Sequence, residues 1–420
     1  MSRVLLLALL AGGAACSAQT SGAGAPPGGP AADSVRGNLP PSRPPFRIEK
    51  LGAFQAPFAM AFLPDGGLLV TEKSGALRLR AGDGAVTTVG GAPAVATGGQ
   101  GGLLDVAVAP DFASSHVIYL SFAEPRPAGS SLALWRGRLT VGAGQTPSLT
   151  GGEVLWRAGS DGKGGQFGAT ILFAQDGQSL FLASGERQRF TPAQDPDQAL
   201  GKILHLTLDG KPWPGNPQAG KIGAATVSVI DPPADTAAAA SAPARATTFD
   251  GPNFAPAATW TSGHRNPYGL AFDRAGRLWE VEMGPKGGDE VNLIVKGRNY
   301  GWPIVSNGDN YDGLPIPDHR PGDGFEAPRL WWNPSISPGG MMIYTGAMFP
   351  QWRGNMFVAA LSGKALIRVH LDGDTARPGD QWDMGTRIRD VTQAPDGAIW
   401  LLEDGERGAA GQLLRLTPMK

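Results

Sequence analysis

The sequence predicts an all-β protein built as a six-bladed β-propeller, and three observations support this prediction. Apolar runs are short and are separated by turns, with Gly 62 and Pro 37 among 420 residues. Six segments share one plan, in which an apolar strand, a turn that often carries Asp-Gly and a second apolar strand follow one another. These segments recur at irregular intervals, as propeller blades with loops of unequal length do. A large β-sandwich, the competing architecture, does not explain why one hairpin pattern recurs.

The predicted hairpins cover residues 58–72, 103–122, 169–186, 269–283, 341–361 and 388–404. A last strand near Gln412 is expected to complete a blade together with an early strand, because propellers close their ring in this way. The alanine-rich segment 231–252 is interpreted as an inserted, poorly ordered surface loop without chemistry.

The first 45 residues are predicted to lie outside the folded body, which comprises residues 46–420. Residues 1–15 are typical of a signal peptide, and their apolar run is too short to span a bilayer. Cys16, the only cysteine, resembles the lipidated N-terminus of a bacterial lipoprotein; plain signal-peptidase cleavage is the alternative. Residues 16–45 are too polar and too rich in glycine and proline to fold, which predicts a disordered tether. We therefore expect an exported, periplasmic protein that is lipid-anchored at Cys16.

The charge balance excludes one class of partner. Lys+Arg 36 and Asp+Glu 37 give a net charge of -1, and no basic stripe stands out. Nucleic acid is therefore not an expected partner.

The stretch Trp260–Pro303 is the most informative part of the chain. It sets two polar turns, GHRNPYG and GPKGGDE, at the two ends of a short hairpin. Charged and amide side chains that are held on glycine- and proline-constrained backbone are typical of a ligand site on a rigid β scaffold.

GHRNPYGLAF followed by GPKGGDEVNLIVKGRNYGWP resembles the soluble, calcium- and pyrroloquinoline-quinone (PQQ)-dependent aldose/glucose dehydrogenases. A looser similarity extends from about Phe54 to Pro418. The resemblance implies a six-bladed propeller whose ligands bind at the mouth of the central channel.

The resemblance also implies roles for individual residues. The main-chain carbonyls of Gly284 and Pro285 are expected to bind calcium. Asp289 and Glu290 lie close by and have three alternative roles: they support this site, they form a separate ion site, or they are solvated or capping residues. His264 is expected to fix its loop by a backbone hydrogen bond. The residues expected to contact the cofactor are Arg265, Asn266, Ser335, Lys364, Arg387 and Arg389. Lys364 is the weakest of these, since Ser362 falls near the position of a family lysine.

The implied catalytic residues are Gln100, Gln166 and Glu186, and here the chain departs from the family. Gln166 occupies the position of the histidine that serves as general base in the family. A glutamine amide can orient a hydroxyl group but cannot take its proton near neutral pH. Glu186, which corresponds to the partner of that histidine, is therefore the predicted proton acceptor.

Three functions remain open at this point. The first is a PQQ- and calcium-dependent dehydrogenase that oxidises aldose sugars or related alcohols and passes electrons to an external acceptor. The second is a non-catalytic lipoprotein that binds a sugar or a quinone, which the glutamine at position 166 favours. The third is a calcium-dependent, lactonase-like hydrolase, because one fold can host several chemistries.

Overall fold

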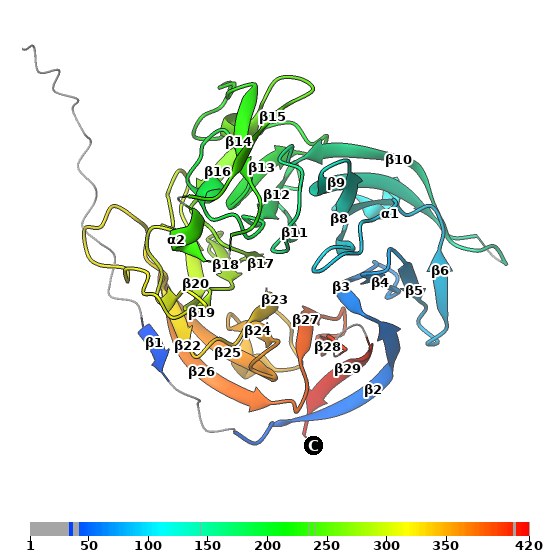
Figure 1. Cartoon of the computed structure of the whole chain (residues 1–420). Coiled ribbons are helices and arrows are strands. Elements are labelled where there is room, and N and C mark those ends of the chain that lie inside the picture. Colours follow the sequence, from blue (N-terminus) through cyan, green and yellow to red (C-terminus); the bar gives the residue numbers. More distant parts are fainter. Residues whose placement is uncertain are drawn as a thin grey trace, which may run out of the picture.

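The computed structural model describes residues 33–36, 42–142, 144–233, 235–239, 241–405 and 409–419. Six sheets, antiparallel except where β1 joins blade 4, surround a central channel (Figure 1), which confirms the predicted six-bladed propeller. The predicted signal peptide and Cys16 lie outside the described residues. No helix in the described part of the chain combines the length and the apolar character that a membrane crossing requires.

We number the blades in chain order and give their strands from the channel outwards. Blade 1 contains β3 (Pro57–Phe62), β4 (Leu68–Glu72), β5 (Leu77–Arg80) and β6 (Val86–Val89). Blade 2 contains β7 (Leu103–Val108), β8 (Val117–Arg126), β9 (Gly129–Thr140) and β10 (Ser148–Arg157). Blade 3 contains β11 (Gly168–Phe173), β12 (Ser179–Ser184), β13 (Lys202–Thr207) and β16 (Thr259–Ser262).

Blade 4 contains β17 (Pro267–Phe272), β18 (Leu278–Glu282), β20 (Asp289–Ile294), β22 (Leu330–Asn333) and β1 (Asp33–Arg36). Blade 5 contains β23 (Pro338–Ile343), β24 (Met356–Ala360), β25 (Ala365–Asp372) and β26 (Thr375–Asp383). Blade 6 contains β27 (Ile388–Gln393), β28 (Ile399–Glu403), β29 (Ala410–Pro418) and β2 (Phe46–Gln55). The connections between these strands contain three short helices and two 3-10 turns: α1 (Phe112–Ser115), α2 (Thr236–Ala239), α3 (Ala255–Ala258), Thr191–Ala193 and Pro350–Trp352. They also contain two small two-stranded sheets. One pairs β14 (Thr226–Ile230) with β15 (Ala244–Thr248), and the other pairs β19 (Lys286–Gly287) with β21 (Gly308–Asp309).

Each predicted hairpin forms the two inner strands of one blade, and the first strands of neighbouring blades contact each other around the channel. The expected ring closure is also present. β29 pairs antiparallel with β2, from Phe46 opposite Pro418 to Gln55 opposite Ala410 (Figure 1). Strands from both ends of the chain thus share one sheet.

Two segments are more ordered than the sequence indicated. Residues 33–36, which the prediction places in the tether, form β1 parallel to β22 (Figure 1). Val35 is buried in the core against that blade. The segment 231–252, predicted as a poorly ordered loop, contributes β15 to the hairpin with β14 and also contains α2. Short backbone pairing escaped detection because neither segment shows apolar alternation.

The apolar core lies between neighbouring blades, where facing sheets pack together. Trp279 on β18 packs in one cluster with Val358 on β24, and Leu69 on β4 packs in another with Leu120 on β8. All of these side chains are fully buried. Burial of such a side chain stabilises the fold by roughly 1.5–3 kcal/mol.

The first strand of every blade has a register irregularity near its beginning. At two of these irregularities a backbone N–H is bound by an aspartate of the preceding blade. Asp105 on β7 accepts the backbone N–H of Ile171 on β11 at 2.7 Å, and Asp390 on β27 accepts that of Met60 on β3 at 2.9 Å. These irregularities therefore join blades at the end of the channel where the candidate site lies.

Candidate functional site

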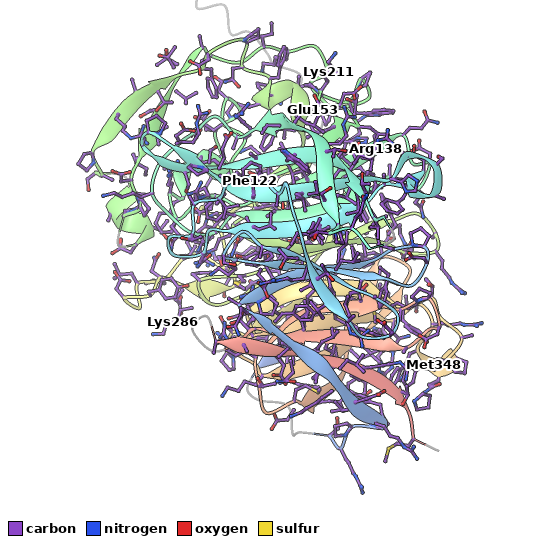
Figure 2. The ribbon with its side chains drawn as sticks, turned by 90° about the vertical axis from the view of Figure 1, so that its right-hand side faces the viewer. Phe122, Arg138, Glu153, Lys211, Lys286 and Met348 are labelled. Atoms are coloured by element: carbon purple, nitrogen blue, oxygen red, sulfur yellow. The ribbon has the colours of Figure 1, made fainter. Side chains whose placement is uncertain are left out.

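The chain topology brings the predicted site residues to one face of the propeller. Because strand directions alternate within a blade, the connection from the second to the third strand and the connection to the next blade lie on the same face. Lys286, which follows β18, lies on this face, whereas Met348, between β23 and β24, lies on the opposite one (Figure 2). We call the first the mouth face. Its connections carry Gln100, Gln166, Glu186, Arg265, Asn266, Gly284, Pro285, Ser335, Lys364 and Arg387, and Arg389 lies at the start of β27.

Arg265, between β16 and β17, is the centre of the candidate site. Its side chain is buried, with Nη1 donating to Met283 O at 3.0 Å and to Gly284 O at 2.5 Å. Nη2 donates to Tyr311 Oη at 3.2 Å, and the guanidinium lies over the Trp302 ring at 5.2 Å. The turn predicted to bind metal and the arginine predicted to bind cofactor are therefore in direct contact.

Glu282 on β18 holds the loop that carries Arg265. Its carboxylate accepts the backbone N–H groups of Arg265 at 2.6 Å and of Asn266 at 3.2 Å. His264 lies 3.0 Å from the same carboxylate through Nδ1, and its Nε2 lies 2.9 Å from Thr261 Oγ1. The imidazole is fully buried. These two side-chain contacts therefore hold the loop in addition to the predicted backbone hydrogen bond.

The structure brings the three predicted catalytic residues together. Gln100 Oε1 accepts the backbone N–H of Gln166 at 2.7 Å. The Gln166 amide bridges Arg265 and Glu186 when its oxygen faces Arg265 Nη2 at 2.8 Å and its nitrogen faces Glu186 Oε1, the orientation that satisfies both partners. Gln166 thus contacts a base candidate and a cation at once.

Glu186 is fully buried at the end of β12. Its Oε2 accepts the backbone N–H groups of Arg189 and Phe190, each at 2.5 Å. Burial raises the pKa of Glu186 above its ordinary value, while the Arg265 charge and the backbone hydrogen bonds oppose that rise. A carboxylate whose pKa is raised is a better proton acceptor when it is ionised.

Two buried arginines that the sequence analysis did not assign hold this region in shape. Arg187 donates to the carbonyls of Gly164 and Gly165, and Arg189 donates to those of Ser160 and Lys163. Both stand in the motif SGERQRF beside Glu186, so the sequence signal was present. Positive φ values occur at four residues of the same region, Gln166 (50), Arg187 (63), Gln188 (59) and Phe190 (59). Non-glycine residues rarely adopt such backbone, and its clustering is typical of functional loops.

The turn after β18 is organised by Asp289. One carboxylate oxygen accepts Gly284 N–H at 2.8 Å, and the other accepts the N–H groups of Ile336 at 2.7 Å and Ser337 at 2.6 Å. Ser335 Oγ accepts Gly287 N–H at 2.9 Å. Asp289 therefore caps backbone groups, one of the roles considered for it, and Ser335 joins this turn to blade 5.

Arg387 and Arg389 lie on the opposite side of the mouth and share one carboxylate. Arg387 Nε contacts one oxygen of Asp404 at 2.8 Å, and Arg389 contacts the other at 2.6 Å and 2.8 Å. The Arg389 guanidinium lies over the rings of Phe58 at 5.1 Å and Tyr268 at 5.9 Å. Asp404 was not predicted, although it ends the sixth hairpin, whose last letters are LLED.

Tyr268 links the two sides of the mouth. Burial raises the pKa of its hydroxyl, while Arg389, a hydrogen bond with the Asn266 side chain and the charge of Arg265 all lower it. Both groups of arginines therefore act on the same tyrosine. Lys364, at the turn between β24 and β25, has an exposed side chain.

A buried acidic cluster lies behind the Arg265 loop. Asn292 Nδ2 donates to Glu280 Oε2 at 3.0 Å, to Glu282 Oε1 at 3.2 Å and to Glu290 Oε2 at 3.1 Å. Burial raises the pKa of Glu280 and of Glu290, and the charge of Glu282 raises both further. His264, Glu280 and Glu282 place ligand atoms within 4.8 Å of one another, a donor set that could hold a divalent cation.

Glu290 was predicted from the sequence as one candidate ion ligand, whereas Glu280 and Glu282 were not predicted as site residues. These residues alternate with apolar ones in LWEVE, and that alternation favoured an exposed polar face. Both glutamates are instead buried, because blades cover both faces of β18.

Known proteins resemble this chain over most of its length. Residues 54–229 and 237–415 match the family model described as Glucose / Sorbosone dehydrogenase. Over 371 residues the chain is 36% identical to aldose sugar dehydrogenase YliI of Escherichia coli (strain K12), covering 86% of this chain and 90% of that protein. It is 26% identical to quinoprotein glucose dehydrogenase B of Acinetobacter calcoaceticus, with 84% of each protein covered.

A solved structure of the PQQ-bound form of aldose sugar dehydrogenase (Adh) from Streptomyces coelicolor superimposes with a TM-score of 0.66 at 27% identity. The superposition covers 90% of this chain and 99% of that one. The family match extends over most of the propeller, including every candidate site residue described above. The chain therefore belongs to the glucose/sorbosone dehydrogenase family.

Proposed function

We propose that this chain is a PQQ- and calcium-dependent dehydrogenase that oxidises aldose sugars or related alcohols. The observation that carries the proposal is the contact chain from Gln100 through Gln166 to Glu186 and Arg265. It unites a buried carboxylate, a buried guanidinium and two amides at the mouth of the channel. The names of the relatives support a sugar as substrate and PQQ as cofactor.

The residues of the mouth suit a flat, anionic cofactor. Arg265, Asn266, Arg387 and Arg389 would hold it, because guanidinium groups pair with carboxylates and stack on planar rings. The buried Nε of Arg265 has no hydrogen-bond partner among the described residues and is a free donor for a ligand or water. When bound, PQQ would accept the hydride from the substrate carbon. Ser335 would hold the adjoining turn in place.

For calcium we propose the carbonyls of Gly284 and Pro285. Gly284 O accepts a hydrogen bond from Arg265, and Ser335 Oγ lies 3.5 Å from Pro285 O. A carbonyl oxygen has two lone pairs, so it can bind a cation as well as one donor. A calcium ion would act there as a Lewis acid.

Glu186 is the proposed proton acceptor. Its Oε1 faces the Gln166 amide, and its Oε2 is fully used by backbone N–H groups. A substrate hydroxyl would therefore reach Glu186 by displacing the amide of Gln166 from Oε1. Gln166 and Gln100 would then orient the sugar hydroxyls.

Reconstitution tests the proposal. Apo-protein should bind PQQ stoichiometrically in the presence of calcium and should then reduce an artificial dye with at least one aldose. Tight PQQ binding without activity toward a broad sugar panel would favour the second function, a non-catalytic binding propeller, for which the amide at position 166 is the supporting observation. Failure to bind PQQ at all would reject both the cofactor and the dehydrogenase.

A further inference from the structure

A lysine outside the predicted site lies at the rim of the mouth. Lys73 directly follows β4, in a connection that belongs to the mouth face. Its backbone N–H donates to Ala56 O at 3.0 Å, and the N–H of Ala56 donates to Ala409 O at 3.1 Å. The Lys73 turn is thereby fixed beside the connection that follows β28 and begins with Asp404.

Lys73 also contacts the loop that carries Gln100. Its Nζ donates to Gly99 O at 3.1 Å. A Cβ added to Gly102 would lie 2.3 Å from Lys73 O, so only glycine permits this close approach. Lys73 thus contacts the loop that carries Gln100, while its own turn lies beside the connection of blade 6 that begins with Asp404.

The charges at this rim are not balanced among the described residues. Arg387 and Arg389 both pair with Asp404, whereas the ammonium group of Lys73 has a neutral carbonyl as its hydrogen-bond partner. Lys73 is half-buried, and its pKa is lowered first by burial and then by the nearby Arg389, while Asp404 raises it. Three cations therefore gather around one carboxylate, an arrangement that an additional anion would stabilise.

We propose that Lys73 and Arg389 form a carboxylate-binding subsite at the rim of the mouth. The inference rests on the proposed function and deepens it. The subsite takes either a carboxylate of the bound quinone cofactor or the carboxylate of an acidic sugar, such as a uronic acid. Lysine suits this role because its ammonium group is a point charge on a flexible stem that can follow a ligand.

Two variants and one control test the subsite. Lys73→Ala removes the charge, and Lys73→Arg keeps it. Lys211→Ala is the control, because Lys211 is exposed at the outer edge of blade 3, far from Lys286 and the mouth face (Figure 2). Circular dichroism and the melting temperature confirm that each variant folds.

The first arm measures PQQ binding by calorimetry in calcium buffer at low and high salt. Loss of a charged hydrogen bond of about 1.5 kcal/mol weakens binding roughly tenfold. We expect Lys73→Ala to show this loss and a flatter salt dependence, Lys73→Arg to recover part of the affinity, and Lys211→Ala to match the wild type. This result assigns the carboxylate to the cofactor.

The second arm measures kcat/KM for a uronic acid against the corresponding neutral aldose. A tenfold fall in that ratio for Lys73→Ala, with PQQ affinity unchanged, assigns the carboxylate to the substrate. If neither quantity changes, the subsite is wrong, while wild-type dye reduction leaves the proposed function standing. A wild type that binds no PQQ overturns the proposed function and this inference together.

Discussion

The two sides of the mouth are built in different ways. On the side of blades 3 and 4, Arg265, Gln166 and Glu186 are buried and joined by direct contacts. On the side of blades 6 and 1, Arg387 and Arg389 pair with Asp404 at a more open rim. The first side resembles a protein interior, where an unpaired polar group is costly, whereas water can compensate a lost partner on the second.

This difference separates two tasks. A buried network fixes the positions of reacting groups to within a fraction of an ångström, which proton and hydride transfer require. Charged groups on a solvated rim attract and orient an anionic ligand without such precision. We therefore expect changes on the buried side to affect rate and stability, and changes on the rim to affect mainly affinity.

The largest expected effect is that of Glu186→Gln. Loss of a positioned general base lowers kcat by roughly 10²–10⁴-fold, while PQQ affinity should stay close to the wild-type value. Stopped-flow reduction of the bound quinone measures this step. Gln166→His is the matched gain-of-function control: an imidazole beside Glu186 should raise kcat. Unchanged turnover in Glu186→Gln would assign the proton to another acceptor.

The pH profile of the same reaction sharpens the assignment. The pKa of Glu186 is raised, and only the ionised form accepts a proton. The rate should therefore rise with pH as Glu186 loses its proton and then level off. In Gln166→His the rising limb should move toward the pKa of the new imidazole.

Arg265→Lys is expected to have the next largest effect. Lysine keeps the positive charge but cannot reproduce the contacts of the guanidinium with Met283 O, Gly284 O and Tyr311. Each lost hydrogen bond from a charged group costs about 1.5–3 kcal/mol. Both the melting temperature and PQQ affinity should fall, as thermal unfolding and calorimetry would report. A loss of affinity without a loss of stability would show that the buried side is less interdependent than its contacts indicate.

Arg387→Ala should have a smaller effect that is confined to affinity. Its partner Asp404 keeps two contacts with Arg389, so the rim should retain its shape. PQQ binding should weaken by roughly tenfold or less, in line with the loss of one half-buried charge contact, and the melting temperature should hardly change. A large fall in stability would show that the contacts of the rim support the fold as much as the contacts of the buried side do.

The two sides also differ in how far the sequence predicted them. The fold followed from hairpin repetition, since a strand pair with an Asp-Gly turn is specified locally. Arg387 and Arg389 are two residues apart, the spacing of one strand face, and both contact one carboxylate. Such local patterns survive folding because the inner hairpin of each blade is formed by residues close together in sequence.

The remaining features depend on contacts between distant segments. Gln100 reaches Gln166, and Gln166 reaches Arg265, only because the ring brings separate blades together. Charged residues on buried strands, such as Glu280, carry no periodic signal that distinguishes them from exposed ones. Resemblance named the residues of the mouth, but their partners had to come from the structure.

The smallest expected effect on activity lies below the mouth, in the two channel aspartates, whose effect on stability tests whether the difference between the sides extends there. Asp105 joins blade 2 to blade 3 beneath the buried side, and Asp390 joins blade 6 to blade 1 beneath the rim. Burial raises the pKa of Asp105 to about 7 and that of Asp390 to about 6, with Arg389 opposing the rise at Asp390. Both line a cavity of about 170 Å³ in the channel, where water can screen part of the shift.

A folded-state pKa above the unfolded value means that the folded state binds the proton more tightly. The stabilisation is therefore complete below about pH 4 and is lost as the pH rises through 6 at Asp390 and 7 at Asp105, by at most about 1.4 kcal/mol per pH unit for each group. Melting temperatures measured from pH 4 to 8 should fall less steeply in Asp105→Asn than in the wild type, with a smaller change in Asp390→Asn. The slopes are compared, not the absolute values, because each amide also alters a backbone contact. Three parallel curves would mean that channel water solvates both carboxylates fully, and that the contrast between the two sides is confined to the mouth.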